Sequence, residues 1–136
     1  MLRLFPIPLM LFPALALAEL EIGDAWIKNL PPAVPVRAGY MTIRNPSSSA
    51  QRIVAVASAS FASVEIHQSL MRDGMMRMEK QDELLIGAGA TVKLEPGGLH
   101  LMMMGPLQPT KPGEVHRVNL ELGDGSTQPV DMTVRE

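Results

Sequence analysis

Histidine and methionine side chains gather in one segment of this 136-residue chain, where together they could bind a soft metal ion. The chain has 11 methionines and 3 histidines. Seven of these methionines lie between His67 and Met104: Met71, Met75, Met76, Met78, Met102, Met103 and Met104. Thioether sulfur binds Cu(I) and is a poor ligand for zinc, calcium or magnesium, whereas imidazole binds several transition metals including copper. A mixture of imidazole and thioether groups therefore indicates a Cu(I) site.

The segment that begins at His100 alternates in a way that separates ligand candidates from core residues. Side chains point to opposite faces along a β-strand, so His100 shares a face with Met102 and Met104. Leu101 and Met103 point to the other face. We therefore expect Met103 in the core and Met102 beside His100.

The same reasoning applies to the earlier half of the segment. Val64 and Ile66 should point toward the core, which turns His67 outward. Met76 and Met78 are two residues apart and share a face. Two histidines and at least two methionines can therefore converge on one solvated patch. The sequence leaves open whether Met71, Met76 or Met104 also contribute.

Core packing and protein docking compete with metal binding as roles for the clustered methionines. Methionine often fills irregular gaps in a core, and an exposed methionine patch can be a docking surface for another protein. A docking role would make the chain a β-sandwich adaptor. Valine, isoleucine and leucine already occupy the expected core faces of these strands. Histidine interleaved with methionine on the outward face has no packing reason, and this favours metal binding.

Composition excludes several classes of function. Without cysteine the chain can form no disulfide, Cys-ligated zinc site, thiol nucleophile or type 1 blue copper centre. The formal charge of −2 argues against a nucleic-acid partner, which would favour a basic surface. Ser47, Ser48 and Ser49 form a loop without a His–Asp pair that could activate a nucleophile. We expect no catalytic residues and no enzymatic activity.

The first 18 residues have the pattern of a secretory signal peptide. Arg3 supplies the positive charge, an apolar run follows from Leu4 to Leu17, and the cleavage pattern A-x-A ends at Ala18. The run is too short for a stable membrane span, which needs about 20 apolar residues. The mature domain is thus predicted to cover residues 19–136, in the periplasm if the host is a Gram-negative bacterium. We expect it to be a monomer.

The mature chain is predicted to be a single all-β domain. Pro and Gly total 23 residues and separate short stretches with a period of two. The expected strands lie at 22–27, 39–44, 52–58, 63–68, 76–80, 91–95, 99–104, 117–122 and 130–135. The Asp73-Gly74 pair predicts a hairpin turn. With no amphipathic helix pattern, this arrangement indicates an antiparallel β-sandwich with Greek-key connections.

The spacing of the candidate ligands resembles a known signature. His67, Met78, His100 and Met102 match the pattern H-x10-M-x21-H-x-M of the periplasmic copper chaperones called PCu(A)C. The similarity extends over nearly the whole mature chain. Further similar stretches are 24–26 (DAW), 31–32 (PP), 38–45 (AGYMTIRN) and 96–105 (PGGLHLMMMG).

This resemblance implies a cupredoxin-like β-sandwich that binds one Cu(I) through His67, Met78, His100 and Met102. It also implies delivery of copper to an acceptor protein, toward the Cu(A) centre of cytochrome c oxidase. A periplasmic copper storage or tolerance protein would use the same ligands and differ only in its partner. The sequence leaves that choice open.

Overall fold

The computed structural model describes residues 5–8 and 19–136, and every regular element in these two ranges is a β-strand. The predicted signal peptide lies largely outside the described residues. Within them, no helix is long and apolar enough to cross a membrane. The strands are β1 (Glu21–Lys28), β2 (Val36–Arg44), β3 (Gln51–Ala57), β4 (Phe61–Arg72), β5 (Met75–Gln81), β6 (Leu84–Ile86), β7 (Thr91–Leu94), β8 (Leu99–Pro106), β9 (Val115–Leu122) and β10 (Thr127–Arg135).

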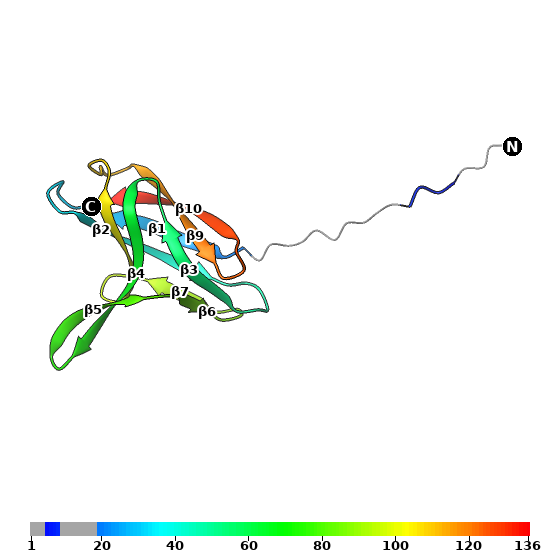
Figure 1. Cartoon of the computed structure of the whole chain (residues 1–136), viewed down its shortest axis with the longest axis horizontal. Helices are drawn as coiled ribbons and strands as arrows, with labels where there is room; N and C mark the ends of the chain where they lie inside the picture. The colour runs from blue at the N-terminus through cyan, green and yellow to red at the C-terminus, as the bar shows by residue number, and fades with distance from the viewer. Residues whose placement is uncertain (1–4, 9–18) are drawn as a thin grey trace.

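The strands form one sheet that closes around a single core. Their order is β5-β4-β8-β2-β1-β10-β9-β3-β6, with β7 paired to β2. A further contact between β3 and β4, through Val56 and Val64, closes the sheet into a flattened barrel. All pairs are antiparallel except β1 with β10. The hairpin of β4 and β5 projects from the body of this barrel (Figure 1).

The predicted all-β class is confirmed, and the nine predicted strands all match observed ones. Strand β6 was not predicted, because three residues are too few to show a period-2 pattern. The fourth strand was predicted to end too early, since β4 continues to Arg72. The predicted turn is present, with positive φ angles at Asp73 (52°) and Gly74 (74°) that fit a two-residue hairpin connection.

Alternation along the strands fills the core from every side of the barrel. Val64 and Ile66 of β4 are buried as expected, and so are Leu101 and Met103 of β8. Met132 of β10 is also fully buried. The remaining core residues are aliphatic except for Met41 and Phe61: Leu20, Ile27, Met41, Ile43, Ile53, Val56, Phe61, Leu84, Ile86, Leu94, Val118, Leu120, Leu122, Val130 and Val134.

Gly39 lets the backbone of β2 pack closely against the buried side chains of Met103 and Met132. A Cβ atom at this position would lie 3.0 Å from Cε of Met132 and 3.1 Å from Sδ of Met103. It would also lie 3.3 Å from Cβ of Leu101. All three neighbours are buried in a closely packed interior and have little room to move.

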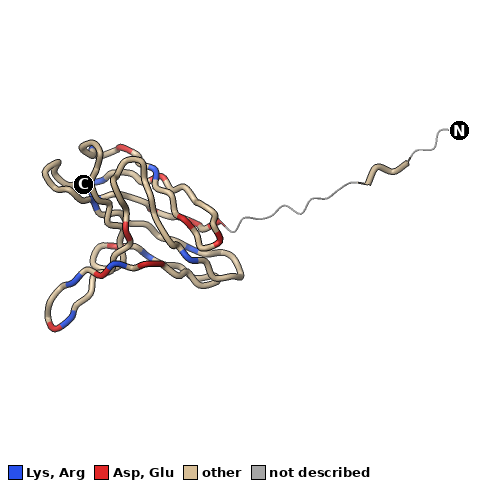
Figure 2. Tube along the Cα trace, viewed as in Figure 1, with Lys and Arg blue, Asp and Glu red and all other residues tan. Residues whose placement is uncertain are grey.

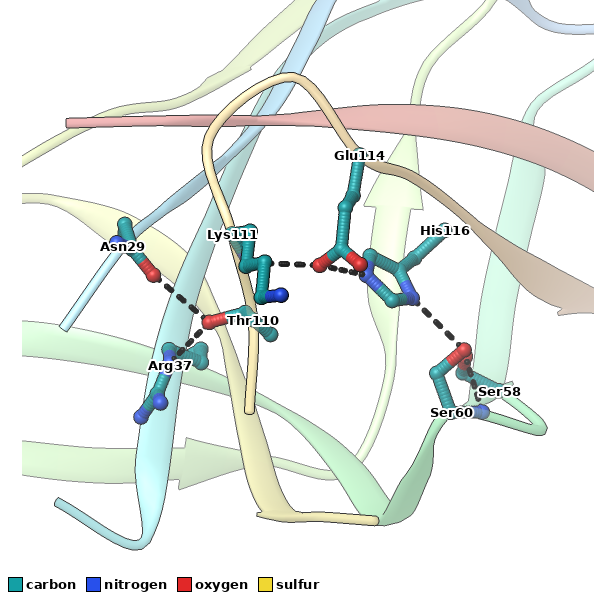
Figure 3. A network of polar contacts seen from close by, with 8 residues as sticks. All are labelled: Asn29, Arg37, Ser58, Ser60, Thr110, Lys111, Glu114 and His116. Carbon is teal, nitrogen blue, oxygen red and sulfur yellow. Dashed lines mark hydrogen bonds and ion pairs between the residues drawn. The ribbon is translucent and has the colours of Figure 1, made fainter. Parts of the chain in front are cut away.

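A buried arginine anchors the irregular loop between β1 and β2. Arg37 is only 1% exposed, and its guanidinium donates to the carbonyl oxygens of Val34 (2.7 Å) and Val36 (2.8 Å). It also donates to Oγ1 of Thr110 at 2.8 Å, which in turn donates to Asn29 (Figure 3). These hydrogen bonds pair the N–H groups of the buried Arg37 guanidinium with acceptors. They also link the start of β2 to the loop before β9.

Charged residues of both signs are distributed along the described trace, including the projecting hairpin (Figure 2). One exposed pair joins neighbouring strands, where Arg117 of β9 donates to Asp131 of β10 at 2.9 Å. The hydrogen bond from Arg117 lowers the pKa of the Asp131 carboxyl below its ordinary value. Both side chains are more than half exposed, so the pair contributes little to stability.

Replacing Gly39 with alanine should destabilise the barrel. The added methyl group would press on Met103 and Met132, and overpacking of this kind typically costs about 1–3 kcal/mol. Thermal or urea unfolding of Gly39→Ala would measure the effect. Gly74→Ala, whose Cβ meets nothing within 4 Å, tests the strain of a positive φ without overpacking. A Gly39→Ala variant as stable as the wild type would contradict the tight packing.

Candidate metal centre

The pairing of β4 with β8 determines which side chains meet. Val64 pairs with Met103 and Ile66 pairs with Leu101, and these four face the core. The alternate pairs point to the outer face, where Glu65 lies opposite Met102 and His67 lies opposite His100.

His67 and His100 are therefore direct cross-strand neighbours. Their ring centres are 6.1 Å apart and the ring planes are tilted by 35°. A metal–imidazole bond is about 2 Å long and a ring nitrogen lies roughly 1 Å from its ring centre, so one ion bound linearly to both rings holds the centres about 6 Å apart, and a bent arrangement holds them closer. The observed spacing lies at the upper end of this range, so a three- or four-coordinate ion would draw the two rings together.

These histidines are less exposed than strand alternation predicted. His100 is 5% exposed, and the side chain of His67 is 14% exposed. The expectation of a solvated patch is wrong for this pair. The reason is topological, because β8 lies between β4 and β2 in the interior of the sheet. A partly desolvated position strengthens interactions with a bound ion relative to water.

A hydrogen bond to Glu65 determines which nitrogen of the neutral His67 ring carries the proton. Nε2 of His67 lies 2.8 Å from the Glu65 carboxylate, which also interacts with Nζ of Lys80 at 3.7 Å. The bond to His67, with a smaller contribution from Lys80, lowers the pKa of Glu65. An ionised carboxylate can only accept, so Nε2 donates. In the neutral ring Nδ1 then has a free lone pair, and Nδ1 is buried without a hydrogen-bond partner among the described residues.

His100 has the opposite tautomer. Its Nδ1 lies 3.1 Å from the carbonyl oxygen of Gly98, and a carbonyl can only accept, so Nδ1 donates. This leaves the lone pair on Nε2 when the ring is neutral. Each histidine thus has one nitrogen held by a hydrogen bond and one nitrogen free to bind a metal, which is the usual arrangement around ligand histidines.

The structure places the two predicted methionine ligands at different depths. Met102 is half-buried and lies two residues from His100 on the same face of β8. Met78 lies on β5 opposite Ser69, one diagonal step from His67, and is 59% exposed. Because β4 separates Met78 from His100, the structure brings His67, His100 and Met102 together and leaves Met78 further out.

The remaining candidates lie on the core face, further along β8, or elsewhere in the barrel. Met103 is fully buried, as predicted, and Met104 is half-buried on the outer face. His116 is half-buried in a separate network (Figure 3). Its Nδ1 lies 2.9 Å from Oγ of Ser60, and its Nε2 lies 3.5 Å from Glu114.

Glu65 and Lys80 were not predicted as parts of the site. A signal for Glu65 was present in the sequence, because it lies two residues before His67 and must share its face. Lys80 pairs with His67 across β4 and β5 and could have been found only from the hairpin register. Within residues 5–8 and 19–136, no three His, Cys, Asp or Glu side chains gather closely enough to hold a metal ion by themselves.

Proteins of similar sequence identify the family. The family model described as "Putative lipoprotein LpqE-like" matches residues 20–134. The chain belongs to the LpqE-like family. Its relatives include "Putative lipoprotein Lxx21020" of Leifsonia xyli subsp. xyli, 31% identical over 117 residues, covering 85% of this chain and 69% of the relative. "Uncharacterized protein RP573" of Rickettsia prowazekii is 26% identical over 121 residues, covering 86% of this chain and 67% of the relative.

Solved structures place this LpqE-like chain among copper-chaperone folds. The "Copper-bound PCuAC domain from PmoF2" matches with a TM-score of 0.72 and 20% identity, covering 85% of this chain and 92% of that domain. The structure described as CuI-DR1885 from Deinococcus radiodurans matches with a TM-score of 0.72 and 33% identity, covering 90% of this chain and 81% of the other. The predicted cupredoxin-like fold and the resemblance to PCu(A)C proteins are both confirmed.

Met102 and Met103 are adjacent in sequence and should respond to mutation in opposite ways. Met102→Leu should weaken Cu(I) binding by about tenfold or more, since a soft ligand is lost, and leave the melting temperature nearly unchanged. Met103→Ala should cost about 2–5 kcal/mol of stability because it opens a cavity in the core, with little effect on affinity. Chelator competition and thermal melting measure both. Loss of copper binding in Met103→Ala but not in Met102→Leu would mean that β8 is shifted by one residue.

Proposed function

We propose that this protein is a periplasmic copper chaperone that binds one Cu(I) through His67, Met78, His100 and Met102. The observation that supports this most directly is the facing pair of imidazoles, each with one nitrogen fixed by a hydrogen bond and the other free. The similarity to the Cu(I) form of the Deinococcus protein gives independent support. Copper is the cargo of such a protein, and no bond of a substrate is made or broken.

In this proposal each residue has a separate part in holding the ion. His67 binds through Nδ1 and His100 through Nε2, the nitrogens that their hydrogen bonds leave free. Met102 supplies a thioether from the same face of β8. A closed-shell d¹⁰ ion has no geometric preference from its d electrons, as for Zn²⁺, so a site of two nitrogens with one or two sulfurs suits Cu(I).

Met78 is the most exposed of the four proposed ligands. It lies on the projecting hairpin and is 59% exposed, whereas the two histidines belong to the body of the sheet. We propose that the Met78 sulfur, one diagonal step from His67 across the hairpin, completes the site when copper is bound.

The leader and the relatives support export of the protein. The predicted signal peptide at residues 1–18 and the lipoprotein names of relatives are consistent with export. We propose that the exported monomer delivers Cu(I) to an acceptor in assembly of the Cu(A) centre of cytochrome c oxidase. It acts as a carrier and not as an enzyme.

Copper binding and transfer should be measurable directly. The protein should bind one tight equivalent of Cu(I) in competition with a chromophoric chelator and prefer it strongly over Zn(II), because two of its ligands are thioethers. Mixing the copper-loaded protein with the purified Cu(A) domain of cytochrome c oxidase should move the ion to that domain. Zinc binding as tight as Cu(I) binding would refute the site. Tight Cu(I) binding without transfer to that domain would refute delivery and favour storage.

Glu65 should raise the Cu(I) affinity of the site by orienting His67, although its carboxylate does not bind the metal. Replacing it with glutamine leaves the shape of the side chain nearly intact, but an amide can donate to Nε2 of His67 as well as accept from it. The ring is then no longer held with Nδ1 free, and loss of such a partner typically weakens metal binding by about 10–100-fold. Chelator competition measures the affinity, and Glu114→Gln, beside His116 in the separate network, serves as a matched control. An unchanged Cu(I) affinity in Glu65→Gln would contradict the assignment of Nδ1 as the ligand atom.

A further inference from the structure

The tip of the β4–β5 hairpin has a methionine pair that the four-ligand site does not use. Met71 and Met76 lie directly opposite each other in the antiparallel register, and Met78 lies opposite Ser69 one step closer to the barrel. Residues directly opposite in such a pair have Cα atoms about 5 Å apart. Their long, flexible side chains can therefore bring two sulfur atoms to one ion.

These methionines lie on the same face of the hairpin as His67. Side chains alternate along β4, so His67, Ser69 and Met71 share a face, and their partners on β5 are Lys80, Met78 and Met76. The thioethers thus form a row that runs from the tip toward the two histidines. Each step of two residues along a strand is about 7 Å, a distance that two methionine side chains can cover together.

The charged residues near the hairpin tip belong to its other face. Arg72, Arg77 and Glu79 lie there, and Arg72 and Glu79 form a salt bridge of 3.2 Å. Met75 also belongs to that opposite face, because it pairs with Arg72. On the face of Met71 and Met76, the nearest cationic side chain among the hairpin residues of β4 and β5 is Lys80, which lies beyond Met78 and interacts with Glu65.

Packing does not account for these side chains. Met71 is 67% exposed and Met76 is 66% exposed. The pairing of β4 with β8 ends at Gln68 and Leu99, so the tip extends beyond the sheet and covers no core. Large apolar side chains exposed together usually mark an interaction site of some kind. Thioethers aligned toward a proposed Cu(I) site indicate that the ligand is copper itself.

We infer that Met71 and Met76, together with Met78, form a second and weaker Cu(I) site through which copper enters and leaves the histidine site. This inference rests on the proposed function. In the entry step the bonds from copper to Met71 and Met76 break as bonds to His67 Nδ1, His100 Nε2 and the Met102 sulfur form, while Met78 stays bound; release follows the reverse order. Copper remains Cu(I), so no electron is exchanged, and neutral rings offer lone pairs at these nitrogens without release of a proton.

The experiment compares the two faces of the hairpin. Cu(I) is titrated into the protein against a weak chelator, and the methionine methyl groups are followed by NMR after ¹³C labelling. Wild-type protein should bind a second equivalent at least tenfold more weakly than the first, with shifts at Met71 and Met76.

In the double variant with Met71→Leu and Met76→Leu the second equivalent should be lost, and copper uptake by the first site should slow at least fivefold. The affinity of the first equivalent should stay within about twofold, since the four-ligand site is intact. Met75→Leu, on the opposite face, should behave as wild type.

The outcomes separate this inference from the proposed function. Tight binding of one equivalent with no second equivalent in wild-type protein would overturn the second site and leave the chaperone proposal standing. A second equivalent that persists in the double variant would also overturn it. Unchanged stoichiometry together with slower transfer to the acceptor would assign the patch to protein docking instead. Methyl shifts at Met71 and Met76 without a tight first equivalent would support the hairpin site and refute the histidine site.

Discussion

The register between β4 and β8 is the constraint on which the rest of this molecule depends. Because side chains alternate with a period of two, a single alignment assigns Val64 and Met103 to the core and His67 and His100 to the outer face. A slip by one residue would turn the histidines toward the core and the core residues toward the outer face. The same set of backbone pairs thus fills the core and brings the two imidazoles together across the strands. Stability and ligand geometry are coupled in this way.

The candidate site combines a fixed part with a movable part. His67 and His100 lie on strands paired on both sides, and hydrogen bonds to Glu65 and Gly98 orient their rings. Met78 lies on a two-stranded hairpin beyond the edge of β8, and such a hairpin has little stability of its own. A carrier needs both properties. In the proposed site the fixed nitrogens give a preformed pair of ligands, the thioethers give selectivity for Cu(I), and a ligand on the projecting hairpin allows release.

The sequence predicted the parts of this arrangement that depend on local alternation. It separated Met102 from Met103 and identified nine of ten strands, because the hydrophobic pattern along a single strand is sufficient for both. It could not predict features that depend on which strands become neighbours. The parallel pairing of β1 with β10, the contact of Lys80 with Glu65 and the burial of His100 all arise from sheet order. The resemblance to a known signature nevertheless supplied the set of ligands that alternation alone left open.

Methionine serves opposite purposes within one short segment, and the difference is entirely positional. Met103 is fully buried and packs against Gly39 and Met132, where a flexible apolar side chain fills the space left by a glycine. Met102, one residue earlier, presents the same chemical group to the histidines. Exposing the methionines of the hairpin forgoes the gain from burying them, and none of them belongs to the hydrophobic core of the described chain. The proposed binding of Cu(I) explains why these positions have thioethers and not charged side chains, since thioether sulfur is a soft ligand that suits this ion.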